Sequence, residues 1–339
     1  MASHLLRLED VKESSSEATL EEKITERKAS KVLSCLAYAF LSVSITLFNK
    51  AVFSVYKFQF PTFVTLVQIF LSIVFMVFLG EARVIDFGIK NRKGGVLGLN
   101  WNMAMKVFPL AFFWMLYVQS GLLALRHLTV PMFGALRRST TLVVAIGEYV
   151  LLGQRTPRSS MIAIMVMVSG AALAGATDLS YNARGYAWVS ICVLSTAAFL
   201  ILIRTIGKEL ELNQHALLLY NNILSLPMVL LWFLFATEEP KSVFSAPQWI
   251  DPSFVMFLLI SASQAFFLNL CVFWCTTENS ALVTTIVGEF STLILAQKEE
   301  RTRSIQQKFS ARKSHHSCLD HHSIRGLCFF LFKSLEIDN

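Results

Sequence analysis

Long apolar runs recur along this chain, and they constrain its fold more than any other feature. A helix needs about 20 consecutive apolar residues to cross the hydrocarbon core of a bilayer. Such runs, separated by short polar connections, fill residues 32–296. With 54% hydrophobic and 16% charged residues, the chain has too little polar surface to cover soluble domains of its length. We therefore predict an all-α membrane protein, because membrane-spanning strands are much shorter than these runs.

Nine candidate spans follow from the apolar runs, and the last of them is weaker than the others. Residues 1–31 have no apolar core resembling a signal peptide, and we predict a disordered cytosolic tail there. Residues 32–296 are predicted to form one transmembrane bundle. The candidate spans are residues 32–53, 60–80, 104–125, 129–152, 159–177, 185–206, 215–236, 253–276 and 280–296.

Positive charge is distributed unevenly between the loops and predicts the orientation. Lys and Arg residues gather before the first span and after the second, fourth and sixth spans. Because cytoplasmic loops are enriched in these residues, we expect these loops and the amino terminus to face the cytosol. This placement accounts for the net charge of +7 without nucleic-acid binding. No Gly-rich phosphate loop or catalytic triad pattern occurs, so we predict neither an enzyme nor a cofactor.

Two adjacent arginines, Arg137 and Arg138, lie inside the fourth candidate span. An ionisable residue at mid-helix costs about 2.5 to 3.5 kcal/mol on insertion scales, so this pair should avoid lipid. We expect the pair to line a polar cavity, where the guanidinium fork suits the oxygens of a diphosphate. The alternative is structural: one arginine snorkels to the interface or pairs with Glu148.

Two further polar elements interrupt the apolar pattern. Lys50 lies near the far end of the first span, where it could bind a phosphate or reach the membrane interface. Tyr220, Asn221 and Asn222 occupy the first half of the seventh span. Amides inside an apolar helix need hydrogen-bond partners, and a nucleobase or sugar edge would supply them. Hydrogen bonds between helices, without any ligand, are the alternative.

These elements resemble the nucleotide-sugar transporters of the solute carrier 35 family, within the drug/metabolite transporter superfamily. The resemblance runs from about residue 32 to about residue 288, and it is closest to the transporters of UDP-N-acetylglucosamine, UDP-glucuronate and related UDP-sugars. Five segments carry it in the family's order: Leu128–Arg138, Ala176–Leu179, Gly185–Ala187, Leu219–Asn222 and Asn279–Gly288.

The resemblance implies ten helices in two inverted repeats of five, with the substrate bound centrally between them. It also implies exchange of a cytosolic UDP-sugar for a lumenal nucleoside monophosphate across a Golgi membrane, or alternatively the endoplasmic reticulum membrane. Whether the protein forms a homodimer stays open. The arginine pair would neutralise the diphosphate, and Asn221 and Asn222 would read the base or ribose. The other predicted binding residues are Lys50 and Tyr220, with Asn279, Ser280, Thr284 and Gly288 toward the sugar.

After Gly288 the sequence departs from the family pattern. Ser291 and Thr292 stand where relatives typically have Lys-Asn, so one phosphate contact is missing. Residues 297–339 are predicted to form a basic, disordered tail outside the family, leaving about eight or nine of the ten helices; we interpret it as a product of alternative splicing or gene-model error. The alternative functions are an inactive form that pairs with or regulates the full-length carrier, and a carrier of another organic phosphate such as triose phosphate.

Overall fold

The computed structural model describes residues 25–26, 28–49, 52, 55–85, 87, 101–176 and 182–290. Regular secondary structure within these ranges is helical, which confirms the predicted all-α membrane fold. Six of the described helices are long and apolar enough to cross a membrane. Lys50, the positions of the missing Lys-Asn, most of the predicted amino-terminal tail and the whole predicted carboxy-terminal tail lie outside the described residues.

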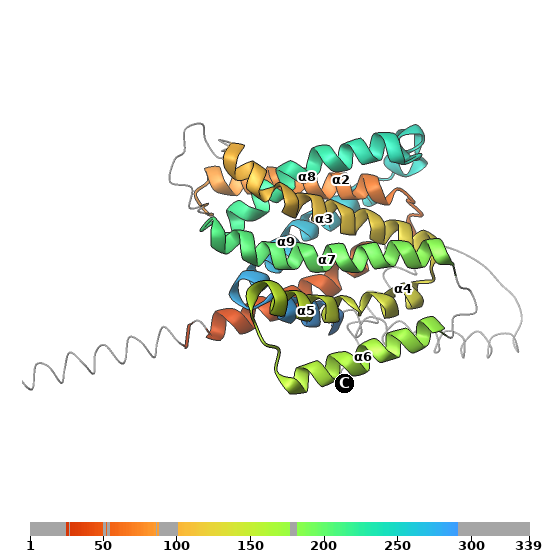
Figure 1. The fold of residues 1–339 in the computed structure, drawn as a ribbon. Helices are drawn as coiled ribbons and strands as arrows, with labels where there is room; N and C mark the ends of the chain where they lie inside the picture. Colours follow the sequence, from red (N-terminus) through yellow and green to blue (C-terminus); the bar gives the residue numbers. More distant parts are fainter. Residues whose placement is uncertain are drawn as a thin grey trace, which may run out of the picture. The chain divides into compact units, whose positions relative to one another are not determined.

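The described helices follow the candidate spans, with one exception. The fourth candidate span is two helices, α4 and α5, so the prediction of a continuous helix there was wrong (Figure 1). Three short 3-10 helices lie between α8 and α9: η2 Glu239–Lys241, η3 Val243–Ser245 and η4 Pro247–Ile250. The helices are an amino-terminal helix Lys28–Asn49, α2 Pro61–Glu81, α3 Trp101–His127, α4 Val130–Arg137, α5 Thr140–Leu152, α6 Arg158–Ala176, α7 Ala183–Glu209, α8 Gln214–Ala236, α9 Pro252–Glu278 and a final helix Ala281–Phe290.

Local sequence signals explain where several of these helices begin and end. Asn182 caps α7, since its side-chain oxygen accepts from the backbone N–H groups of the second and third helical residues, at 3.1 and 3.3 Å. Asp251 caps α9 by accepting from Ser253 N at 2.9 Å. Pro61 begins α2, where a missing N–H is tolerated. Gly153 ends α5 in the left-handed conformation at φ 64°, which favours glycine.

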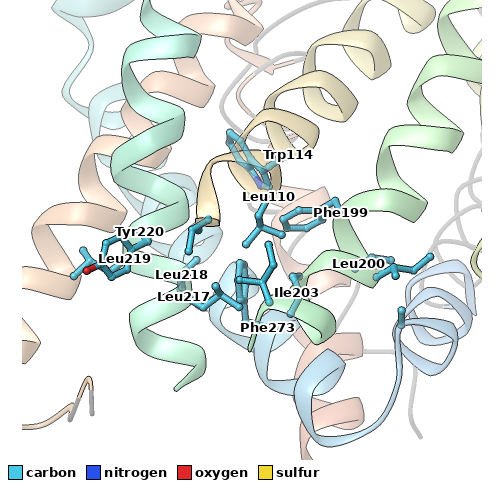
Figure 2. Packing of buried hydrophobic residues seen from close by; sticks show 14 of the residues in the cluster. Leu110, Trp114, Phe199, Leu200, Ile203, Leu217, Leu218, Leu219, Tyr220 and Phe273 are labelled. Atoms are coloured by element: carbon cyan, nitrogen blue, oxygen red, sulfur yellow. The ribbon is translucent and has the colours of Figure 1, made fainter. Parts of the chain in front are cut away.

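The main hydrophobic cluster joins the parts of the chain before and after residues 177–181. We call the described helices through α6 the first half, and those from α7 onward the second half. The most extensive packing between described helices runs along α3 and α7, which therefore join the two halves (Figure 1). Figure 2 shows how this cluster fills the space between helices with large apolar side chains, among them Leu110 and Trp114 of α3, Phe199 and Ile203 of α7, Leu217 of α8 and Phe273 of α9.

Gly185 lies at a close contact between the start of α7 and the residues that precede α4. A Cβ atom on Gly185 would lie 2.7 Å from Leu128 Cγ and 3.0 Å from His127 Cβ. Both atoms are near the backbone and cannot swing away, so a larger residue would push the two elements apart. Gly170 of α6, by contrast, has no neighbouring atom within 4 Å of such a Cβ.

Gly185→Ala should therefore destabilise the bundle by about 1–3 kcal/mol, the usual cost of overpacking. Thermal unfolding of the purified protein in detergent measures this as a lower Tm. Gly170→Ala is the matched control and should leave the Tm unchanged or slightly higher. A Tm for Gly185→Ala equal to that of the control would contradict the contact.

Candidate functional site

The interruption of the fourth span lies at the predicted arginine pair. Arg138 and Ser139 have φ/ψ values of −59°/−21° and −61°/−19°, which are typical of a 3-10 turn. Their N–H groups bond three residues back, to Ala135 O at 3.3 Å and Leu136 O at 3.0 Å. Thr140 Oγ1 donates to the Arg137 carbonyl at 2.7 Å. Because these bonds satisfy the backbone, the span can change direction inside the membrane at this point.

Arg137 lies where several helices meet. Its guanidinium carbon is 5.9 Å from the centroid of the Phe133 ring, within the range of a cation–π contact. The side chain is half-buried, as is that of Arg138. Electrostatic neighbours of Arg137 come from the amino-terminal helix, α3, α7 and the final helix: Tyr38, Tyr117, Cys192 and Glu289.

Glu289 is the acidic residue that interacts electrostatically with both arginines. Within the described ranges, no carboxylate lies within 4.0 Å of either guanidinium, so Glu289 forms no contact ion pair with them. Among the described residues, the two arginines thus share one acidic neighbour, which offsets only part of their positive charge. The alternative that an arginine pairs with Glu148 is wrong, because Glu148 Oε1 is 3.4 Å from Nη1 of Arg204 instead.

The three predicted binding residues of α8 have different surroundings, although all are buried. Asn222 donates from Nδ2 to Ser72 Oγ of α2 at 2.7 Å, so this amide makes the hydrogen bond between helices that the structural alternative expected. Neither the nitrogen nor the oxygen of the Asn221 side chain has a partner in the described part of the chain. Tyr220 belongs to the main hydrophobic cluster beside Leu219 (Figure 2).

Asn221 shares its unmet hydrogen bonding with other buried atoms. Ser225 lies one turn further along α8, on the same face, and its hydroxyl also has no partner among the described residues. Each unmet buried group costs about 1–3 kcal/mol, so proteins keep such groups mainly where water or a ligand can meet them. Further side-chain atoms without a partner among the described residues lie on other helices: Gln119 Nε2 of α3 and Thr141 Oγ1 of α5.

Asn279 and Ser280 are engaged in local structure. Asn279 Nδ2 donates to the Lys31 carbonyl at 3.3 Å and to Ser34 Oγ at 3.1 Å, which ties the end of α9 to the amino-terminal helix. Ser280 Oγ accepts from Val283 N at 3.1 Å and caps the final helix. Both residues therefore hold one end of the bundle together.

Thr284 and Gly288 lie at different levels of the final helix. Thr284 is buried and accepts from Thr276 Oγ1 at 3.1 Å, beside that same end. Gly288 packs against Tyr38, whose hydroxyl would lie 2.6 Å from a Cβ at this position. Nine residues of helix rise about 13 Å, so Glu289 is well separated from Ser280. We use the name arginine level for Arg137, Arg138 and the residues near them, which are Tyr38, Tyr117, Cys192, Gly288 and Glu289.

Glu289 was not among the predicted binding residues, although the sequence carries a signal for it. An ionisable residue within an apolar span is a functional candidate in its own right, and Glu289 directly follows Gly288 in the ninth candidate span. Tyr38 and Tyr117 were also missed. They carry no comparable signal, since tyrosines are common in spans and only packing brings these two to Arg137.

The fold and the arginine level define a multi-pass helical membrane protein with a charged, interrupted span. A family model described as the Triose-phosphate Transporter family matches residues 30–296. The chain belongs to this family, which consists of transporters and not of enzymes.

Named relatives support the resemblance inferred from the motifs. The chain is 34% identical over 273 residues to the UDP-N-acetylglucosamine transporter UGNT1 of Arabidopsis thaliana, covering 80% of this chain and 78% of that one. It is 32% identical over 259 residues to the UDP-sugar transporter UST74c of Drosophila melanogaster, covering 76% and 66%. It is 30% identical over 273 residues to the GDP-mannose transporter GONST1 of Arabidopsis thaliana, covering 78% and 79%. The similarity to nucleotide-sugar transporters is thereby confirmed.

The two neighbouring amides of α8 give a matched pair of variants. Asn222→Leu breaks the bond to buried Ser72 and should lower the free energy of unfolding by about 1–3 kcal/mol. Asn221→Leu removes an amide that already lacks partners, so stability should stay unchanged or rise. Denaturation of both proteins in detergent checks this contrast, and a larger loss for Asn221→Leu would show that its amide has a partner in the ligand-free protein.

Proposed function

We propose that the chain carries nucleotide sugars across an internal membrane, with a UDP-sugar such as UDP-N-acetylglucosamine as its cargo. The arginine pair at the interrupted fourth span carries this proposal. Both guanidinium groups are half-buried, and the nearby Glu289 makes no contact ion pair with them. A fork of N–H donors suits the oxygens of a diphosphate, the one charged group shared by all such cargo. The names of two of the similar relatives favour the UDP-sugar class.

The remaining predicted residues take separate roles in this proposal. Asn221 meets the base or ribose, because neither end of its amide has a partner among the described residues. Asn222 holds α8 against α2 and orients its neighbour. Gly288 borders the sugar, while Asn279, Ser280 and Thr284 hold the end of the bundle where α9 finishes, because their polar atoms already have partners. Lys50 remains a proposed phosphate ligand.

In the proposed mechanism, a cytosolic UDP-sugar exchanges for a lumenal nucleoside monophosphate. Alternating access requires one central site that both ligands occupy in turn while one half of the bundle rocks against the other. A ligand shifts this equilibrium only by as much as it prefers one state over another. We place the protein in the Golgi membrane, or alternatively the endoplasmic reticulum membrane, with a cytosolic amino terminus, as the loop charges suggest.

Purified protein in liposomes preloaded with UMP tests the function. Labelled UDP-N-acetylglucosamine should accumulate, and Arg137→Ala combined with Arg138→Ala should reduce its binding at least about a hundredfold through loss of charge-assisted hydrogen bonds. Arg155→Ala, in the exposed loop after α5, is the control and should leave uptake unchanged. Unchanged affinity in the double variant, with normal insertion, would remove the arginine assignment.

Competition in the same liposomes separates cargo classes. UMP should inhibit uptake, GMP should inhibit it weakly and a triose phosphate should not inhibit it. The family description favours an organic-phosphate carrier as the second candidate, and inhibition by triose phosphate alone would support it. Nucleotide binding without any uptake would instead indicate the inactive form that pairs with another carrier.

A further inference from the structure

A buried carboxylate joins the two halves of the protein at the end of the bundle where α9 finishes. Glu148 of α5 accepts from Ala281 N at 2.8 Å and from Leu282 N at 3.4 Å, and so caps the final helix. The same oxygen lies 3.4 Å from Arg204 Nη1 of α7. Glu148 is 3% exposed, so these three bonds are sheltered from water. A first-half carboxylate thus holds two second-half helices.

A second buried carboxylate forms the reverse arrangement where α9 begins. Glu239, in the connection after α8, accepts from Thr62 N at 3.2 Å and Phe63 N at 2.9 Å, and so caps α2. It also lies 3.9 Å from Arg126 Nη2 at the end of α3, and it is 5% exposed. A second-half carboxylate thus holds two first-half helices. The 27 residues of α9 rise about 40 Å and separate this bridge from the first.

The two bridges share the same chemical parts. Each has one carboxylate, the amino-terminal N–H groups of one helix from the opposite half and one arginine from the opposite half. A carboxylate at a helix amino terminus is favoured by both the free N–H groups and the helix dipole. Neither bridge includes a residue of the arginine level, and neither is needed to bind a ligand there.

We propose that Glu148 and Glu239 are the two gates of the carrier, one at each end, and that they open in alternation. This inference rests on the proposed transport function. The contacts of both bridges are formed in this structure. Movement of one half against the other must break one bridge and can retain the other. Removing either carboxylate's charge should therefore favour opening at its own end only.

A cavity of about 600 Å³ approaches the Glu148 gate. Its walls include Arg204 and Lys208, one turn apart on α7, and Thr277 and Glu278 at the end of α9. Arg204 therefore faces both this cavity and Glu148. A ligand that enters from this end would reach the gate before it could reach the arginine level.

Thiol labelling of purified protein tests the gates one at a time. Cys275 is fully buried beside the Glu148 end, and Val243 is fully buried beside Glu239. With Cys275 as the single cysteine, Glu148→Gln should raise its labelling rate by a polar maleimide about tenfold, the effect of losing one charge-assisted bond. With Val243→Cys as the single cysteine, Glu239→Gln should do the same. Each variant should leave the labelling rate of the cysteine at the far end unchanged or should lower it.

Arg204→Met and Arg126→Met provide a second set of variants that keep the helix caps and remove only the cation at each end. They should give the same pattern of labelling rates, and they replace a Gln variant that does not fold. Size-exclusion chromatography detects such misfolding. Faster labelling at both ends in one variant, or at neither end in all four, would overturn the proposal. Labelling does not require transport, so the two proposals can fail separately. The expected changes in labelling rate without any uptake would refute only the proposed function. Uptake with unchanged labelling rates would refute only the gates.

Discussion

The structure depends on one constraint: polar groups inside lipid must find their partners within the protein. The interrupted fourth span obeys it through backbone bonds that reach three residues back and through the hydroxyl of Thr140. The arginine pair at this interruption satisfies the constraint only in part. Glu289 reduces its charge from a distance, and no contact ion pair with another described residue completes the neutralisation. Under the proposed function, an anionic cargo would supply the remaining negative charge.

The sequence predicted the helices well because hydropathy is what decides a membrane span. Each of the nine candidate spans except the fourth overlaps one described helix. The motifs also led to the correct family. The break in the fourth span at Arg138 and Ser139 was not predicted, because a single 3-10 turn leaves the hydropathy of the surrounding sequence unchanged. The ion-pair partner of Glu148 was not predicted either. Glu148 pairs with Arg204, 56 residues away, because α5 packs on α7.

Asn221 and Asn222 show why residue type and spacing leave roles open. Both are buried amides on one helix, and a helix turns by about 100° between neighbours, so they face different surroundings. Asn222 reaches Ser72 of α2 and becomes part of the packing. Asn221 reaches no acceptor or donor in the described part of the chain and stays available to a ligand. Only the helix arrangement separates these two outcomes.

The charge at the arginine level also offers a physical reason for exchange. Under the proposed function, reorientation carries the arginine level past closely packed helices, and uncompensated charge is costly where water is excluded. An empty site would make that passage with excess positive charge. A bound diphosphate or monophosphate would offset this charge and lower the barrier, so the loaded forms would reorient and the empty form would stay. Contact ion pairs between Glu289 and the arginines would remove this difference, which is why their separation matters for coupling.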